Sequence, residues 1–414
     1  MTPRTVWLLA ALALGSAATA QKGGNSKEPK YRLDPYTKNE PEALKKAGYV
    51  RYAPFDYGDP VGAIPHTTDD VDKALFFDKI LWIETAHFKL GTSLDTWNVP
   101  EDLETKRKIL AELTRLSERI PNINKTTKIL DPWLRAHLFA MRLEDVYKQF
   151  QEVIGYADKD FPPDPKSITT GGKFMGYGPY LGQGGKYCVF IANKATSYGE
   201  YLNKFIGKSY VMDQRHNFKL QKDSLFFGTA ADIDKGDKKH DTAIHCRVVF
   251  NVTINLLDGY KHYSYDLPVW LREGMGHWFE RKVSPRWNSY DKDEGSDADA
   301  RDTTDFEGEA RKLVTVNKFT PFSEAGKWRH YGDIKFNDHV ACWSRIDFLF
   351  ATDKKKFAEF IEVMKSMVNP KTFIADNSNM VDVQRDALLK IFGMSARAFD
   401  EKWKEWVLKN YAVK

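Results

Sequence analysis

The sequence predicts an α+β protein that is mainly helical, with a minor sheet and a helical C-terminal third. Long segments carry apolar residues at the spacing of a helix, whereas only a few short runs have the β-branched and aromatic residues typical of strands. Of the 414 residues, 42% are hydrophobic and 14% are aromatic. That proportion indicates a folded core in one large or two ordinary domains rather than a disordered chain.

The first twenty residues have the features of a cleaved export signal. Arg4 precedes an apolar run at 6–14, and Ala18-Thr19-Ala20 supplies the small residues that a signal peptidase recognises. The run has about half of the ~20 residues that a membrane-spanning helix requires. We therefore expect residues 1–20 to be a signal peptide cleaved after Ala20. The mature protein is then periplasmic or extracellular, without stable membrane insertion.

Residues 21–70 predict an irregular leader, because they are rich in Lys, Pro, Gly and Asp and show little periodicity. Residues 71–235 follow as an N-terminal α+β part. Apolar, β-rich runs predict its strands, and apolar stripes at helical spacing predict its helices. The elements expected there are a strand at 80–90, helices at 100–120 and 132–153, and short strands around 187–191 and 224–228.

Residues 236–414 predict a helical part. In its first helix, one apolar stripe at a spacing of four residues is formed by Ile244, Val248, Val252 and Leu256. The helices expected in this part are 241–258, 268–283, 337–351, 354–367, 381–392 and 396–410.

The charge balance is close to neutral. The chain has 62 Lys and Arg against 57 Asp and Glu, a formal net charge of +5. So small an excess does not imply a polyanion partner, and we expect no nucleic-acid binding.

Three cysteines, Cys188, Cys246 and Cys342, allow at most one disulfide. The sequence leaves open whether Cys188 and Cys342 pair.

The segment from Trp270 to Glu280 carries the side chains best suited to chemistry. Glu273 and His277 are four residues apart, and Glu280 is seven residues after Glu273. On a helix all three side chains project from one face. Two glycines, Gly274 and Gly276, each cost a helix about 1 kcal/mol relative to Ala. Their presence indicates that another backbone passes close to this helix.

The sequence from Leu267 to Glu280 resembles the gluzincin metallopeptidase segment that supplies the third zinc ligand. That segment commonly has Pro-x-Trp-Leu-x-Glu-Gly-x-Ala, followed by an aromatic residue and Glu. The tail, with Gly393-Met394-Ser395 and then Trp403, resembles the end of peptidase-MA-like proteins. The likeness covers roughly 240–410, and it implies a gluzincin-like core.

By this resemblance, Glu273 matches the carboxylate ligand and His245 matches the first His of His-Glu-x-x-His. Cys246 stands at the position of the missing general base, and Val249 stands at that of the second His. The motif is therefore degenerate. The resemblance then implies a protein that has lost its zinc site, takes no cofactor and binds a peptide or polymer in the former cleft without catalysis.

An active metal-dependent hydrolase is the alternative. His245, Glu273 and His277 would then hold zinc as two His and one carboxylate, and Glu280 would act as the base. A Cys246 nucleophile beside His245 is disfavoured, because neighbours on a helix point about 100° apart. His87, His137 and His339 lie beside large apolar residues and are expected to be partly buried packing or hydrogen-bonding side chains, whereas His240 is expected to be a cap or surface residue.

Overall fold

The computed structural model describes residues 29–412, except 61–63, 165–168, 171, 221–222, 234–238, 291–303, 370, 373 and 375. The expected export signal and its cleavage site after Ala20 lie outside these residues. By their contacts, residues 1–33 form one unit, whose described part contains a 3-10 turn, Lys30–Arg32. Residues 34–414 form a second unit.

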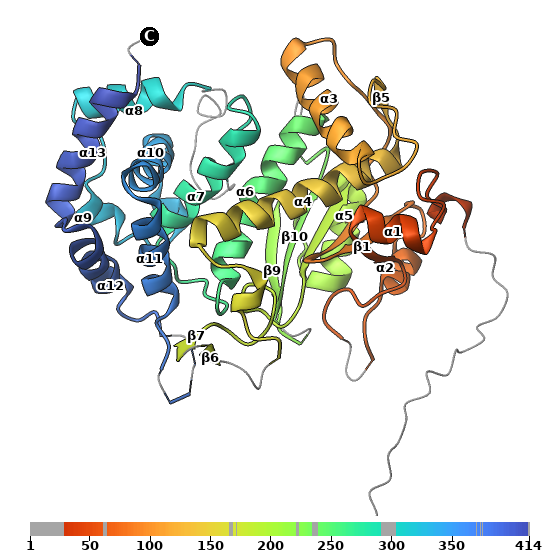
Figure 1. Ribbon diagram of the computed structural model, residues 1–414, viewed down its shortest axis with the longest axis horizontal. Helices are drawn as coiled ribbons and strands as arrows, with labels where there is room; N and C mark the ends of the chain where they lie inside the picture. The colour runs from red at the N-terminus through yellow and green to blue at the C-terminus, as the bar shows by residue number, and fades with distance from the viewer. Residues whose placement is uncertain are drawn as a thin grey trace, which may run out of the picture. The chain divides into compact units, whose positions relative to one another are not determined.

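Six strands of the second unit form one mixed sheet (Figure 1). In order across the sheet these are β1 Tyr49–Tyr52, β2 Leu81–Thr85, β3 Phe88–Thr92, β8 Tyr187–Ala192, β10 Ser224–Ala230 and β9 Gln214–Phe218. The central strands β3, β8 and β10 run parallel, and the other pairs are antiparallel. Every residue of β8 and β10 is buried, as expected for interior strands covered on both faces.

The predicted strand at 80–90 is a hairpin of two strands, β2 and β3. The turn between them is closed by the Thr85 hydroxyl, which accepts from Phe88 N at 3.0 Å. The run from Leu81 to Leu90 contains neither Gly nor Pro, so the sequence gives no local signal for a reversal there. The predicted strands at 187–191 and 224–228 are confirmed as β8 and β10.

The two faces of the sheet are covered by different helices. On one face, Phe226 packs in a core cluster with Tyr198 and Tyr201, which belong to α5 Ala195–Tyr201. Neighbouring residues in a strand point to opposite faces. Thr229 accordingly meets Arg247 of α6 Asp241–Gly259, at 3.2 Å from its Nη1 atom. The long helix α4 Pro132–Ile154 packs against α6 and against β2 and β3 (Figure 1).

Most predicted helices are confirmed, within a few residues at their ends. α3 Leu103–Ser117 begins where Asp102 accepts from Thr105 N, and α4 begins at a capping Asp131 followed by Pro132. The helical C-terminal part contains α7 Val269–Val283, α8 Phe306–Thr315, α9 Phe322–Ala325, α10 Phe336–Thr352, α11 Lys354–Lys365, α12 Met380–Ala387 with the π turn Leu388–Phe392, and α13 Ala396–Asn410.

The expectation of an irregular leader over 21–70 is too simple. Within it lie α1 Pro41–Ala47, strand β1 and the start of α2 Thr68–Ala74. The helix α1 ends at Gly48, whose φ of +81° favours glycine, and α2 begins at a Thr67–Asp70 capping box. These elements have four to seven residues each, and apolar periodicity does not reveal elements as short as these.

The described chain also has smaller elements. Strand β4 Trp97–Asn98 pairs with β5 Ile129–Leu130, and β6 Thr169–Thr170 pairs with β7 Lys173–Phe174. A π turn, Leu202–Ile206, follows α5, and 3-10 turns lie at Asp158–Asp160 and Tyr331–Asp333. Among the described helices, none is long and apolar enough to cross a membrane.

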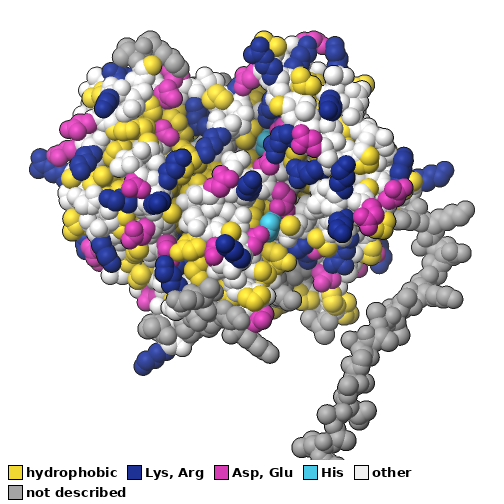
Figure 2. All heavy atoms as spheres, in the orientation of Figure 1, with side chains coloured by type: hydrophobic (Ala, Val, Ile, Leu, Met, Phe, Trp, Pro, Cys, Tyr) yellow, Lys and Arg dark blue, Asp and Glu magenta, His cyan; other side chains and the backbone are white. Residues whose placement is uncertain are grey.

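All three cysteines are buried thiols, and no disulfide joins Cys188 to Cys342. On the face drawn in Figure 2, Lys and Arg side chains are interspersed with Asp and Glu.

Candidate functional site

Helix α7 is held tightly between α6 and α10, and its two glycines permit both contacts. A Cβ atom at Gly276 would lie 2.7 Å from the ring of Phe250 on α6. A Cβ atom at Gly274 would lie 2.7 Å from the carbonyl oxygen of Cys342 on α10. The expected close approach is therefore present, but it involves two helices: Gly276 faces α6 and Gly274 faces the backbone of α10.

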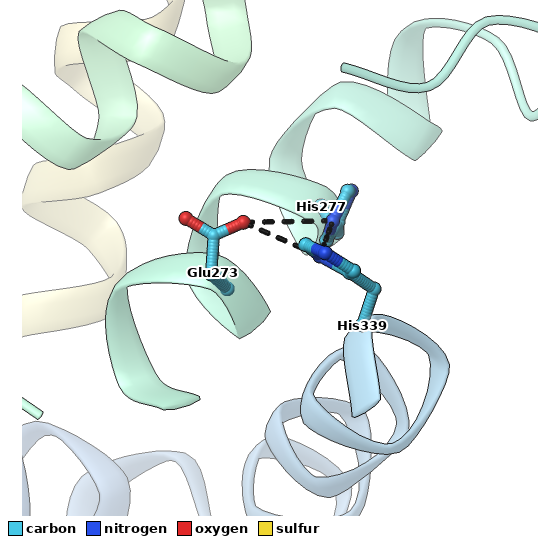
Figure 3. A group of neighbouring side chains, drawn as sticks. All are labelled: Glu273, His277 and His339. Carbon is cyan, nitrogen blue, oxygen red and sulfur yellow. Dashed lines mark hydrogen bonds and ion pairs between the residues drawn. The ribbon is translucent and has the colours of Figure 1, made fainter. Parts of the chain in front are cut away.

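Three side chains from α7 and α10 meet beside this contact (Figure 3). His277 Nε2 lies 3.0 Å from His339 Nδ1. Glu273 Oε2 lies 3.8 Å from His277 Nε2 and 3.4 Å from His339 Nδ1. Each of the three side chains is at most 1% exposed. Among the described residues, these three form the group of His, Cys, Asp and Glu side chains whose geometry could hold a metal ion.

Glu280 lies on the far side of the His277 ring and orients it. Its Oε1 atom lies 2.6 Å from His277 Nδ1, and its two oxygens accept from Ser289 N at 3.2 and 3.0 Å. Burial raises the pKa of Glu280 well above its usual value, against the hydrogen bonds from Ser289. Burial, together with His339 and Arg281, holds the pKa of His277 well below its usual value. His277 is therefore a neutral imidazole at pH 7.

Aromatic rings enclose the group. The ring centroids of Phe250, Tyr290 and Phe306 lie 4.9, 5.5 and 5.7 Å from that of His277, and Tyr290 also lies 5.0 Å from His339. Such surroundings lower the local dielectric constant, which strengthens electrostatic interactions within the group.

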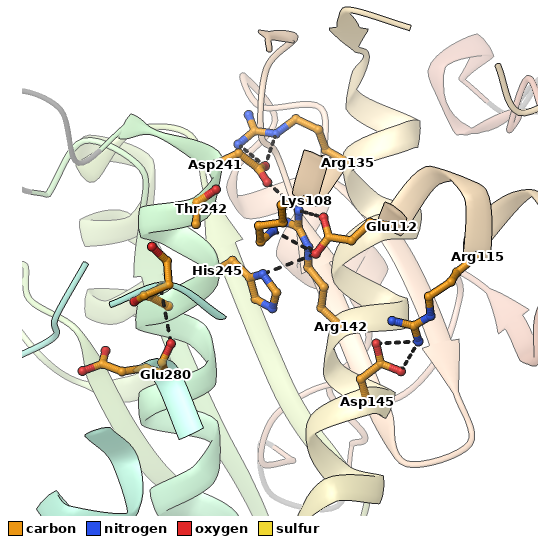
Figure 4. Close-up of polar contacts among 12 residues, drawn as sticks. Lys108, Glu112, Arg115, Arg135, Arg142, Asp145, Asp241, Thr242, His245 and Glu280 are labelled. Atoms are coloured by element: carbon orange, nitrogen blue, oxygen red, sulfur yellow. Dashed lines mark hydrogen bonds and ion pairs between the residues drawn. The ribbon is translucent and has the colours of Figure 1, made fainter. Parts of the chain in front are cut away.

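His245 lies elsewhere, in a buried cluster of charged side chains between α3, α4 and α6 (Figure 4). Its Nδ1 atom is 3.6 Å from Glu112 Oε1. Burial, with the charges of Arg142 and Lys108, holds the pKa of His245 well below its usual value. The structure therefore brings together Glu273 and His277 of the predicted set but not His245, because this position of α6 faces α4 rather than α7.

The remaining predicted positions also lie outside the group. The thiol of Cys246 is 3.8 Å from the carbonyl oxygens of Glu280 and Ser284, and burial raises its pKa well above the usual value. It is a buried thiol that contacts the backbone of α7, with none of the features of a nucleophile. Val249 is 2% exposed and belongs to the core. Glu280, expected as a base in the alternative mechanism, is the hydrogen-bond partner of His277.

His339 is the residue of the group that the sequence did not indicate. It is 62 residues after His277, on a different helix, and no spacing rule connects the two. Its neighbours Val340 and Cys342 are fully buried, which matches the expectation of a packing histidine. Only the packing of α10 against α7 shows its proximity to Glu273.

A separate cavity of about 480 Å³ lies at one end of the sheet. It is lined by Asp56, Gly58, Pro60, Pro65, His66, Glu84, Lys89, Tyr180, Gly184, Gly185, Lys186, Leu220 and Ser224. Lys186 Nζ lies 2.8 Å from Glu84 Oε1 and donates to Thr85 O at 2.6 Å. Lys89 Nζ donates to Asp56 O at 2.7 Å. Both lysines are thus held in place at the cavity wall.

Comparison of the chain with protein-family models finds no match, and comparison with curated protein sequences also finds none.

Proposed function

We propose that this chain is an exported, non-catalytic binding protein with a gluzincin-like core. The observation that carries the proposal is that the residues at the motif positions on α6 cannot act as a base or a zinc ligand. Cys246 and Val249 stand where a peptidase of that class has its base and second histidine, and both are buried in packed interfaces. Loss of a positioned base alone typically lowers a rate by 10²–10⁴-fold.

The side chains near these positions support the same conclusion. His245 lies in the charged cluster, with its Nδ1 atom 3.6 Å from Glu112 Oε1, and is not part of the group on α7 and α10. The Glu280 carboxylate already accepts from Ser289 and contacts His277 Nδ1. A general base must lie within hydrogen-bond reach of a substrate or water, and a fully buried, bonded carboxylate does not meet that condition.

We assign the binding of a peptide or polymer segment to the cavity at the end of the sheet, which no residue of α6 or α7 lines, instead of to the former cleft that the resemblance implies. Its volume of about 480 Å³ lies within the ~300–1,000 Å³ of typical ligand pockets. Lys89 and Lys186 offer donors to carbonyl oxygens, whereas Glu84 and Asp56 offer acceptors to N–H or O–H groups. A ligand with alternating donors and acceptors, such as a peptide backbone, fits walls of both kinds.

Titration calorimetry tests the binding claim, with tetra-alanine as the peptide probe and chitotetraose as the polymer probe. We expect saturable binding of one of them to the full chain, weakened at least tenfold in Lys186→Ala. Lys356→Ala, on the exposed surface of α11, is the matched control and is expected to bind as the wild type does. Absence of binding by both probes would overturn the assignment of the cavity.

A hydrolysis assay tests the claim that the protein is non-catalytic. With fluorescent casein as substrate, we expect no cleavage above background, with or without added zinc. Cleavage that a chelator abolishes and that Glu273→Ala removes would instead establish the metal-dependent hydrolase.

A further inference from the structure

We propose that Glu273, His277 and His339 bind one divalent metal ion of the zinc class, in a site that joins α7 to α10. This metal site is independent of the ligand cavity and of the degenerate motif on α6. It differs from the set His245, Glu273 and His277 in one ligand, His339 in place of His245.

The positions of the three ligand atoms fit such an ion. Glu273 Oε2, His277 Nε2 and His339 Nδ1 form a triangle with sides of 3.0, 3.4 and 3.8 Å. A circle through three points at these separations has a radius of about 2.0 Å, which equals the ~2.0–2.2 Å at which zinc binds imidazole nitrogen and carboxylate oxygen. A point at coordination distance from all three atoms thus exists without movement of any helix.

The donor types select the ion. Two imidazole nitrogens and one carboxylate oxygen suit zinc and its transition-metal neighbours, whereas calcium and magnesium prefer sites built of oxygen atoms. Three protein ligands leave a further coordination position, which no side chain of the described group fills.

The carboxylate of Glu273 gives independent support. Glu273 is completely buried, and neither of its oxygens accepts a hydrogen bond from the described residues. A buried ionised carboxylate without hydrogen bonds is costly unless it is paired or coordinates a metal. A divalent cation at the centre of the triangle would neutralise this charge and occupy the lone pairs of both rings.

Glu280, which contacts His277 Nδ1, supports the role of this histidine as a metal ligand. A metal-bound histidine usually donates its second ring N–H to a carboxylate, which fixes the ring so that the other nitrogen faces the ion. The contact of 2.6 Å between His277 Nδ1 and Glu280 Oε1 is of this kind, and it leaves Nε2 on the side of His339 Nδ1 and Glu273 Oε2, at 3.0 and 3.8 Å. Glu280 is therefore a positioning residue for the metal ligand.

Metal content of the full chain is the direct test. The purified protein is stripped with a chelator, incubated with zinc, freed of excess zinc and measured by mass spectrometry of the metal. We expect one equivalent in the wild type and in His245→Gln, and none in His339→Gln or Glu273→Gln. Glu280→Gln should keep the ion with an affinity lowered ~10–100-fold.

A second measurement needs no variant. X-ray absorption at the metal edge of the zinc-loaded wild type should show two imidazole ligands and oxygen atoms, without sulfur. No metal in the wild type, or sulfur in its coordination sphere, would overturn the proposal. So would loss of the metal in His245→Gln together with its retention in His339→Gln.

Discussion

The rings of His277 and His339 lie at 86° to each other, with His277 Nε2 only 3.0 Å from His339 Nδ1. This arrangement depends on how closely α10 approaches α7, because each helix supplies one ring. The approach is set at Gly274, where a Cβ atom would lie 2.7 Å from the carbonyl oxygen of Cys342. The two glycines of α7 therefore affect both packing and the geometry of the group.

Gly274→Ala should destabilise the protein more than Gly276→Ala. The added methyl group at 274 meets the α10 backbone, which cannot yield without moving the helix, whereas at 276 it meets the ring of Phe250, which can shift. Overpacking costs about 1–3 kcal/mol, against a gain of about 1 kcal/mol in helix propensity. The midpoints of urea unfolding compare the two variants with the wild type. Equal stability of all three proteins would show that α7 and α10 are not in close contact.

Replacement of Arg142 by Met should lower the free energy of unfolding by about 3–5 kcal/mol, because it removes the cation shared by two buried carboxylates and leaves Glu112 with Lys108 and Asp241 with Arg135 alone. The Arg142 guanidinium lies 2.7 Å from both Glu112 Oε2 and Asp241 Oδ2. Urea unfolding followed by tryptophan fluorescence measures the loss. Arg397→Met is the control, since its ion pair with Glu401 is exposed and should contribute little. A similar midpoint for the two variants would contradict the description of the charge cluster as structural.

The same cluster should make the protein sensitive to acid. Burial would raise the pKa of Asp241, but the charges of Arg142 and Arg135 outweigh it, and the folded pKa lies well below the usual value. A carboxylate with a depressed pKa stabilises the fold above its unfolded pKa, about 3.9, and this contribution is lost as the pH falls below that value towards the folded pKa.

Melting temperatures between pH 2 and pH 7 test this dependence. We expect Asp241→Asn to melt at a lower temperature at pH 7 and to lose less stability than the wild type on acidification. Glu405→Gln, on the exposed surface of α13, should follow the wild-type curve. Parallel curves for wild type and Asp241→Asn would remove Asp241 as a source of acid sensitivity.

All three thiols should resist modification in the native protein. Cys188, Cys246 and Cys342 are each 0% exposed, and burial raises the pKa of Cys188 and of Cys246. A chromogenic disulfide reagent should therefore detect no thiol under native conditions and three in denaturant. Fast labelling of Cys246 in the native state would contradict its description as an inert buried thiol and favour the hypothesis of a Cys246 nucleophile.

Expression with the complete leader should give a mature chain that begins at Gln21, because Ala18-Thr19-Ala20 provides the small residues for cleavage. N-terminal sequencing of protein recovered from the periplasm or the culture medium checks this outcome. An intact Met1 on protein retained inside the cell would refute the proposal of export.

The helices were predictable where apolar spacing and capping residues agree. In α4, for example, Asp131 and Pro132 begin the helix and Gly155 ends it with a φ of +74°. The hairpin at Thr85 was missed because its turn is closed by a side-chain hydroxyl within an apolar run. Local sequence reasoning detects elements from spacing, and a turn with no Gly or Pro leaves that spacing unchanged.

The candidate site also has a part that the sequence predicts and a part that it does not. Glu273 and His277 were paired from their spacing of four residues on one helix, and the structure brings them together. The third member could not be found, because the choice between His245 and His339 depends on the direction in which α6 and α10 present their side chains to α7. The orientation of α6 and α10 relative to α7 depends on the packing at Gly276 and Gly274. The spacing of apolar residues in α6 and α10 does not reveal it.

The parallel pairing of β3 with β8 has a consequence for how the chain folds. Residues 93–186, which include α3 and α4, separate these neighbouring strands, so the centre of the sheet forms only when a long loop has closed. Contacts between distant segments slow folding, and pairing of this kind leaves strand edges uncovered in the meantime. The order of assembly is therefore constrained: α4 forms locally, and β8 and β10 then add to the β2–β3 hairpin beneath it. Until β8 pairs with it, one edge of β3 has unpaired backbone groups, and an edge of this kind is a place where two partly folded copies of the chain can associate.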